Sequence, residues 1–264
     1  MFGLQQEVPS AEVLRLFAPS GCQLKAVTLD GSSAPEGMLS ECRKLPALQL
    51  LHVMSGSGVL VLANTALPQL CTLNVGGRWG GGAPGIGLQL VRAALPALQT
   101  LSFASSGSSL SLQHLALPAL RTLIVRASSS ACITHAVLPA LQSLNVVCSG
   151  SVQLACDSMP CLAQLMVHGS PTGADQPLPA LNLADMEFPA LPDFQVVNCS
   201  LNMQRVSMPA LRTLTLTTQP SWSAADVVLP ALRRARLCSI PEGNLSFFSG
   251  GWVRPADRAS CVSL

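Results

Sequence analysis

One phrase recurs nine times along the chain and limits its fold more than any other feature. The phrase is an apolar residue, Pro, any residue, Leu, two free positions, an apolar residue, one free position and an apolar residue. Successive phrases start 22, 28, 22, 21, 21, 29, 20 and 21 residues apart, at Leu45, Leu67, Leu95, Leu117, Leu138, Met159, Phe188, Met208 and Leu229. A period near 21 residues indicates one structural unit stacked on itself, so we predict a solenoid.

Each repeat contains two segments with the alternation of a strand that has one buried face. Within the phrase, apolar Leu101 and Phe103 flank Ser102. A second alternating segment lies seven and five residues before each phrase, as Leu110 and Leu112 do before Leu117. Two such segments facing each other predict a flattened coil, paired in parallel with the next coil at about 4.8 Å. The prolines at equivalent positions of the nine phrases then mark a corner of the coil, where the missing N–H of Pro interrupts no hydrogen bond between strands.

The ends and two insertions depart from the repeat. We expect an N-terminal helical cap over residues 1–20, a solenoid of about ten coils over 21–240 and a C-terminal cap or tail over 241–264. The two long repeats carry their extra residues at the same place, at 76–87 and 169–176. Insertions in repeat proteins form loops on one face, often the binding face.

Composition excludes several classes of protein. Only 11% of residues are charged, 49% are hydrophobic and the net charge is +2, so we expect no nucleic-acid partner. Polar residues interrupt every apolar stretch before the roughly 20 residues that a transmembrane helix needs. The N-terminus shows no basic start followed by an apolar run, so we expect an intracellular, cytoplasmic protein. The ten cysteines show no CxxC pair, and we interpret them as reduced and largely buried.

Leu-x-x-Leu-x-Leu, two free positions and then Asn or Cys is the signature of the leucine-rich repeat family, and the chain resembles a member with short repeats of 20–22 residues. The resemblance runs from about Leu45 to Leu237. It implies a right-handed solenoid that binds other proteins through a concave strand face, since few members are enzymes. The family's Asn position is occupied by Cys199 in one repeat and by Ser in four others, Ser106, Ser128, Ser149 and Ser170.

Candidate chemistry is sparse. Gly80 to Gly85 matches GxGxxG, but the next segment has strand character and the first acidic residue after it is Asp157, so we interpret it as a loop. The repeat register places His52 and His168 on the concave face and His114 and His135 on the back segment. We expect no catalytic residue, no cofactor and no metal site, and therefore no enzyme.

Function is expected to be non-enzymatic protein binding or scaffolding through the concave face and the insertion-loop edge. Trp and Arg often anchor interfaces, and the candidate partner-binding residues are Arg78, Trp79, Arg121, Arg126, Asn145, Met166 and His168. The partner is a protein of unknown identity.

Three alternatives stay open. One is a parallel β-helix enzyme acting on polysaccharide, which requires a carboxylate cluster. Another is a structural solenoid that associates with itself end to end. Separately, Arg121, Arg212 and Arg233 share one repeat position. They form either a solvated edge or a basic strip for an acidic or phosphorylated partner.

Overall fold

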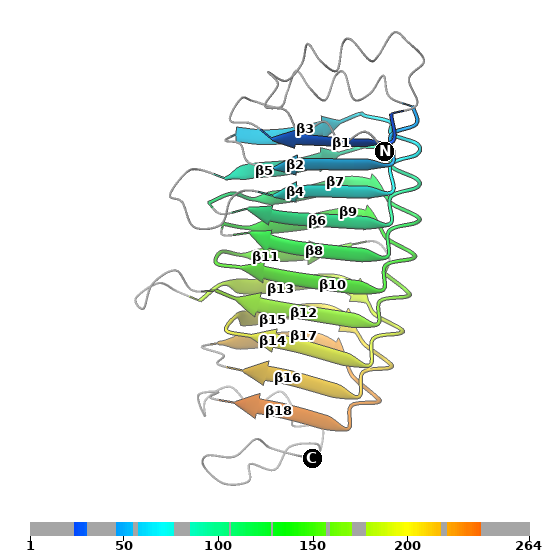
Figure 1. Ribbon diagram of the computed structural model, residues 1–264. Helices are drawn as coiled ribbons and strands as arrows, with labels where there is room; N and C mark the ends of the chain where they lie inside the picture. The colour runs from blue at the N-terminus through cyan, green and yellow to red at the C-terminus, as the bar shows by residue number, and fades with distance from the viewer. Residues whose placement is uncertain are drawn as a thin grey trace.

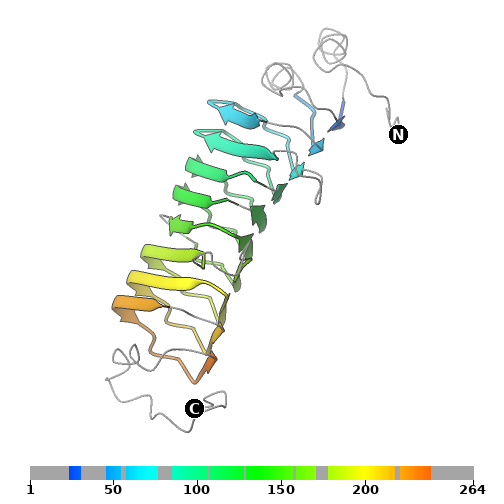
Figure 2. The same ribbon diagram turned by 90° about the vertical axis from the view of Figure 1, so that its left-hand side faces the viewer.

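The protein is a solenoid of two parallel β-sheets, and successive strands alternate between them (Figures 1 and 2). A computed structural model describes residues 24–30, 46–54, 58–76, 85–105, 107–127, 129–156, 159–170, 178–217 and 221–238. One sheet has ten strands and the other eight, which makes about eight turns. These residues contain no helix, and the expected cap at 1–20 and tail at 241–264 lie outside them.

The ten-stranded sheet, sheet A, contains the strands of the recurring phrase. In spatial order they are β1 (Ala26–Asp30), β2 (Leu50–Met54), β4 (Thr72–Gly76), β6 (Thr100–Ser105), β8 (Thr122–Ala127), β10 (Ser143–Cys148), β12 (Gln164–Gly169), β14 (Asp193–Val197), β16 (Thr213–Thr217) and β18 (Arg234–Cys238). The eight-stranded sheet, sheet B, consists of β3 (Gly58–Ala63), β5 (Ile86–Val91), β7 (Leu110–Ala116), β9 (Ala131–Val137), β11 (Val152–Ala155), β13 (Ala180–Glu187), β15 (Ser200–Ser207) and β17 (Trp222–Val228). Strand order follows chain order in both sheets.

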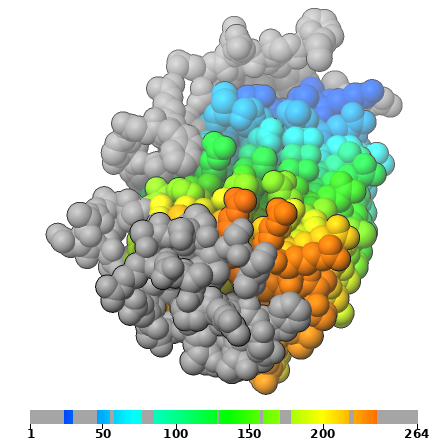
Figure 3. Space-filling view, turned by 90° about the horizontal axis from the view of Figure 1, so that it is seen from below, coloured from blue at the N-terminus to red at the C-terminus, as the bar shows by residue number. Residues whose placement is uncertain are grey.

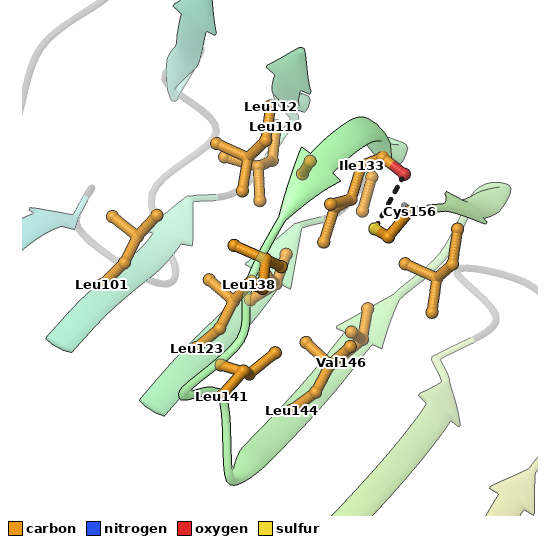
Figure 4. Close-up of a cluster of buried hydrophobic side chains, with 14 of the residues drawn as sticks. Leu101, Leu110, Leu112, Leu123, Ile133, Leu138, Leu141, Leu144, Val146 and Cys156 are labelled. Atoms are coloured by element: carbon orange, nitrogen blue, oxygen red, sulfur yellow. Dashed lines mark hydrogen bonds between the residues drawn. The ribbon is translucent and has the colours of Figure 1, made fainter. Parts of the chain in front are cut away.

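The core lies between the two sheets and is built from the repeated leucines. Leu101, Leu123 and Leu144 are register partners on β6, β8 and β10, and each is fully buried (Figure 4). From sheet B, Leu112 and Ile133 close the core from the opposite side. The predicted two strands per coil and their inward residues are confirmed.

A tight turn at the Pro of each phrase leads into every sheet A strand from β4 onward. In the turn before β4, Pro68 follows Leu67, and the Leu70 N–H donates to the Leu67 carbonyl at 3.2 Å. The same bond recurs in the following repeats with N···O distances up to 3.5 Å. Pro suits the second position of such a turn because its φ is already near the required value. The predicted corner is confirmed.

A second corner bends the strands of sheet B and was not predicted. Three residues before the phrase, a non-glycine residue has a left-handed φ of 50 to 56°: Asn64, Arg92, His114, His135, Asp185, Arg205 and Asp226. The left-handed residue interrupts the alternation of inward and outward side chains along the strand. In β7, Gln113 and His114 therefore both point outward between buried Leu112 and Leu115. Pairing with β9 skips His114 accordingly. The strand therefore turns around the core without leaving the sheet.

The two insertions follow equivalent strands. β4 ends at Gly76 and β12 ends at Gly169, and the two strands stand four places apart in sheet A. Their separation is therefore about 19 Å. The greater part of each insertion, residues 77–84 and 171–176, lies outside the described residues.

Candidate functional site

The outer face of β8, β10 and β12 gathers four of the seven residues predicted to bind a partner. Parallel pairing in register aligns Ile124, Asn145 and Met166 in one column. The next column holds Arg126, Val147 and His168. We call this group the central patch: Ile124, Arg126, Asn145, Val147, Met166 and His168.

Strand alternation explains why these side chains face outward. Leu123 and Val125 of β8 point into the core, so Ile124 and Arg126 must point away from it. Arg126 is exposed, and the other five residues of the central patch are half-buried by their neighbours along the columns. The patch is thus an apolar strip with a guanidinium and an imidazole at its border.

The other three predicted residues lie elsewhere. Arg121 is exposed on the Pro corner before β8, and its backbone carbonyl accepts hydrogen bonds from the next turn at 2.9 and 3.1 Å. It borders the central patch without belonging to it. Arg78 and Trp79 lie outside the described residues.

Asn145 is the least satisfied polar side chain of this face. Its Oδ1 atom is buried and accepts no hydrogen bond within the described structure. The side chains of its column neighbours, Ile124 and Met166, carry no N–H or O–H group to donate. The Ser143 hydroxyl is hydrogen-bonded to Gln164 Oε1 at 3.2 Å. An unmet buried acceptor costs about 1–3 kcal/mol, so a rotation of the Asn145 amide that brings this oxygen to a donor is favoured.

Carboxylates and groups of metal-ligating side chains are scarce on the described part of this face. From β2 to β18, the described residues of sheet A and its Pro turns contain one carboxylate, Asp193. Within the described part of the chain, no three His, Cys, Asp or Glu side chains come close enough to hold a metal ion.

Sheet B carries a polar column at its left-handed positions that sequence reasoning missed. The rings of His114 and His135 stack there on successive turns. Two turns further, Asp185 and Arg205 form a bidentate ion pair through Nε–Oδ1 and Nη2–Oδ2 contacts. The Arg205 guanidinium lowers the pKa of the Asp185 carboxyl. The available signal was a recurrence of Asn, His and Asp three residues before the phrase, since these types tolerate a left-handed backbone.

The corner at the ends of β10 and β12 buries two thiols. Cys148 pairs in register with Gly169, and Cys199 Sγ lies 3.0 Å from the point where a Gly169 side chain would begin. Burial raises the pKa of Cys148 to about 11. Burial, together with nearby Cys148, raises the pKa of Cys199 to about 12. Thiols held neutral in this way are packing groups and poor nucleophiles.

Neither the described strands nor comparison with known proteins points to one function. The described part of the chain contains no helix with the length and apolar character to span a membrane. Comparison with protein-family models, curated proteins and solved structures finds no match to this chain. Function must therefore be inferred from the surface itself.

Proposed function

We propose that the chain is a non-enzymatic protein-binding module or scaffold whose partner docks on the central patch. The observation that carries this proposal is Asn145, whose buried oxygen lacks a donor between two apolar neighbours. Because neighbouring atoms cover this oxygen, a partner that supplies an N–H removes the penalty only when the Asn145 amide turns to meet it. The free energy gained by satisfying this acceptor is obtained only in the complex, which favours partner binding as the role of the patch.

The composition of the patch supports the same proposal. Met and Arg are enriched in protein interfaces, and desolvated apolar cores with a polar border are typical of them. Three strands span only about 10 Å, whereas a standard interface buries about 800 Å² on each partner. The partner must therefore contact neighbouring strands as well. Arg121 at the Pro corner and Arg78 and Trp79 in the first insertion belong to the proposed interface.

Leucine-rich repeat ancestry and an intracellular, cytoplasmic location are part of the same proposal. The repeated Leu-x-x-Leu-x-apolar phrase, with its leucines buried in sheet A, supports the family resemblance. Protein binding is also the commonest role implied by that resemblance.

A comparison of three baits tests the site. The intact protein, Met166→Glu and Gln153→Glu would each be immobilised and incubated with cell extract. Gln153 is exposed on β11 of sheet B, so its variant matches the charge change on the opposite face. We expect proteins that the intact bait and Gln153→Glu retain equally and Met166→Glu loses. Equal retention by all three baits would place the site elsewhere.

Mass measurement in solution separates partner binding from self-association. Light scattering of the purified chain at increasing concentration should give the monomer mass throughout. A mass that rises with concentration and returns to that of the monomer in Met166→Glu would identify a second copy of the chain as the partner.

A further inference from the structure

The small net charge conceals an uneven distribution of charge between the two sheets. From β2 to β18, sheet A and its Pro turns carry six arginines and one aspartate, a net charge of +5. The six are Arg121, Arg126, Arg212, Arg233, Arg234 and Arg236. The described residues of sheet B and the segments that follow its left-handed bends carry two arginines and three acids, a net charge of −1.

The arginines of sheet A are not neutralised within the described structure. All six are exposed and none forms an ion pair with another described residue. On sheet B, by contrast, Arg205 is paired with Asp185. The positive charge of sheet A is therefore available to a ligand.

Four of the six arginines cluster at the C-terminal end of the stack. The Arg233 and Arg234 N–H groups both donate to the Arg212 carbonyl at 3.0 Å, which fixes neighbouring turns side by side. Arg234 and Arg236 occupy alternate outward positions of β18, about 6.6 Å apart along the strand. Figure 3 looks onto this end, with β17 and β18 in orange. Arg126 lies on β8, five strands away and so at about 24 Å.

We infer that the partner of sheet A is acidic, and that a segment rich in Asp and Glu crosses the strands from the central patch to the arginines of β18. This inference rests on the proposed function and names the chemistry of the partner. A guanidinium binds a carboxylate through two parallel hydrogen bonds. About seven residues of extended chain span the distance from Arg126 to Arg236.

The face favours a polypeptide over a single-stranded nucleic acid. Among the described residues, the phenylalanines of sheet A are Phe103 and Phe194, and both are buried in the core. Single-stranded nucleic acids are bound through aromatic side chains on which bases stack, and the described outer face presents no Phe or Trp, only the imidazoles of His52 and His168. The apolar strip of the central patch instead suits the apolar side chains of a polypeptide in which they are interspersed among acidic residues.

Fluorescence anisotropy with a labelled oligo-glutamate peptide of about eight residues tests the inference. We expect binding at low salt that weakens at least about tenfold in the double variant Arg234→Glu/Arg236→Glu. Raising the salt concentration should weaken binding to the intact protein as well. The matched control is Arg92→Glu/Arg205→Glu, which makes the same charge change on sheet B and should alter affinity by less than about twofold.

The outcomes separate the inference from the proposed function. If both double variants weaken the binding of oligo-glutamate equally, the affinity depends on net charge alone, and the inference is overturned. Tighter binding of oligothymidylate or of phosphatidylserine vesicles than of oligo-glutamate would also overturn it. If oligo-glutamate does not bind but Met166→Glu still loses a cellular protein, the inference fails and the proposed function stands. If oligo-glutamate binds in a way that depends on the arginines, but no cellular protein is lost by Met166→Glu, the inference of an acidic ligand is supported. The proposal that the partner docks on the central patch is then contradicted.

Discussion

The imidazole rings of His114 and His135 lie parallel on successive turns, with centroids 4.9 Å apart and 3° between their planes. The stack follows from the backbone, because both residues have a left-handed φ, 52° and 51°, at the bend of their strands. Stacked turns repeat the backbone at about 4.8 Å, so equivalent side chains are brought face to face.

A substitution at this bend should reveal the cost of the left-handed backbone. We expect His114→Val to lower the free energy of unfolding by about 1–2 kcal/mol more than His114→Asn, because a β-branched residue is poorly tolerated at this φ. Both variants remove the ring stack, so their difference isolates the backbone effect. Urea denaturation followed by circular dichroism measures it, and equal stability of the two variants would contradict the assigned conformation.

The terminal glycines of β4 and β12 should respond differently to Ala. Gly76 is in register with His168, whereas Gly169 lies one residue further along its strand and is buried. A Cβ on Gly169 would overlap the carbonyl oxygen of Asn198, whereas a Cβ on Gly76 would meet its nearest neighbour, the Ala104 carbonyl oxygen, at 3.6 Å. Gly169→Ala should therefore destabilise the fold by more than about 2 kcal/mol, and Gly76→Ala by less than about 0.5 kcal/mol. Thermal unfolding of both variants provides the comparison. A Gly169→Ala protein as stable as the parent would rule out the close approach of Asn198.

The inward and outward positions of sheet A predict opposite tolerance of a carboxylate. Leu144→Asp places an unpaired charge in the core and should cost at least about 3 kcal/mol. Ser102→Asp, on the outer face of β6, should change stability by less than about 0.5 kcal/mol. Similar unfolding midpoints in the two variants would disprove the register of β6 and β10.

Alkylation should distinguish the thiols by their surroundings. Cys161 is exposed, whereas Cys148 and Cys199 are buried and held neutral. With iodoacetamide at pH 8, peptide mass spectrometry should find Cys161 modified at least about tenfold faster than Cys148 or Cys199. In denaturant the three rates should converge, because the difference arises from burial. Similar rates in the folded protein would contradict the buried corner.

The same two thiols predict a loss of stability in alkali. Their pKa values rise from about 9 to about 11 for Cys148 and about 12 for Cys199, so the folded state retains protons that the unfolded state releases. Their contribution is complete below about pH 9 and decreases as the pH rises toward 11–12. Cys148→Ala/Cys199→Ala should show a smaller loss between pH 8 and 11 than the parent. An unchanged slope would mean that the thiols titrate normally in the folded protein.

The stacked two-strand coil could be predicted from sequence because its determinants are local and repeated. The phrase specifies which residues alternate into the core, and Leu123 and Leu144 lie where this alternation places them. The Pro corner follows from the chemistry of one residue. The grouping of Asn145 and Met166 also follows, because a fixed period aligns equivalent positions on neighbouring strands.

The remaining features depend on relationships that no single repeat shows. The left-handed bend is occupied by Asn, Arg, His and Asp, a mixture whose common backbone conformation becomes evident only in register. The unmet acceptor of Asn145 depends on which side chains the adjacent turns place beside it. The charge difference between the sheets arises because six of the eight described arginines lie in sheet A and its Pro turns, whereas most described acids lie in the second segments.

Each strand pairs only with its counterparts in the preceding and following turns. Insertion or removal of one complete repeat between the central patch and β18, such as residues 188–207, therefore leaves every remaining turn with neighbours of the same shape. Such a change would shift the arginines of β18 relative to the central patch by one strand spacing, about 4.8 Å. The number of repeats thus sets the distance between the two parts of the binding face. Duplication or loss of repeats during evolution would change, in steps of one strand spacing, the length of the segment that the protein can bind.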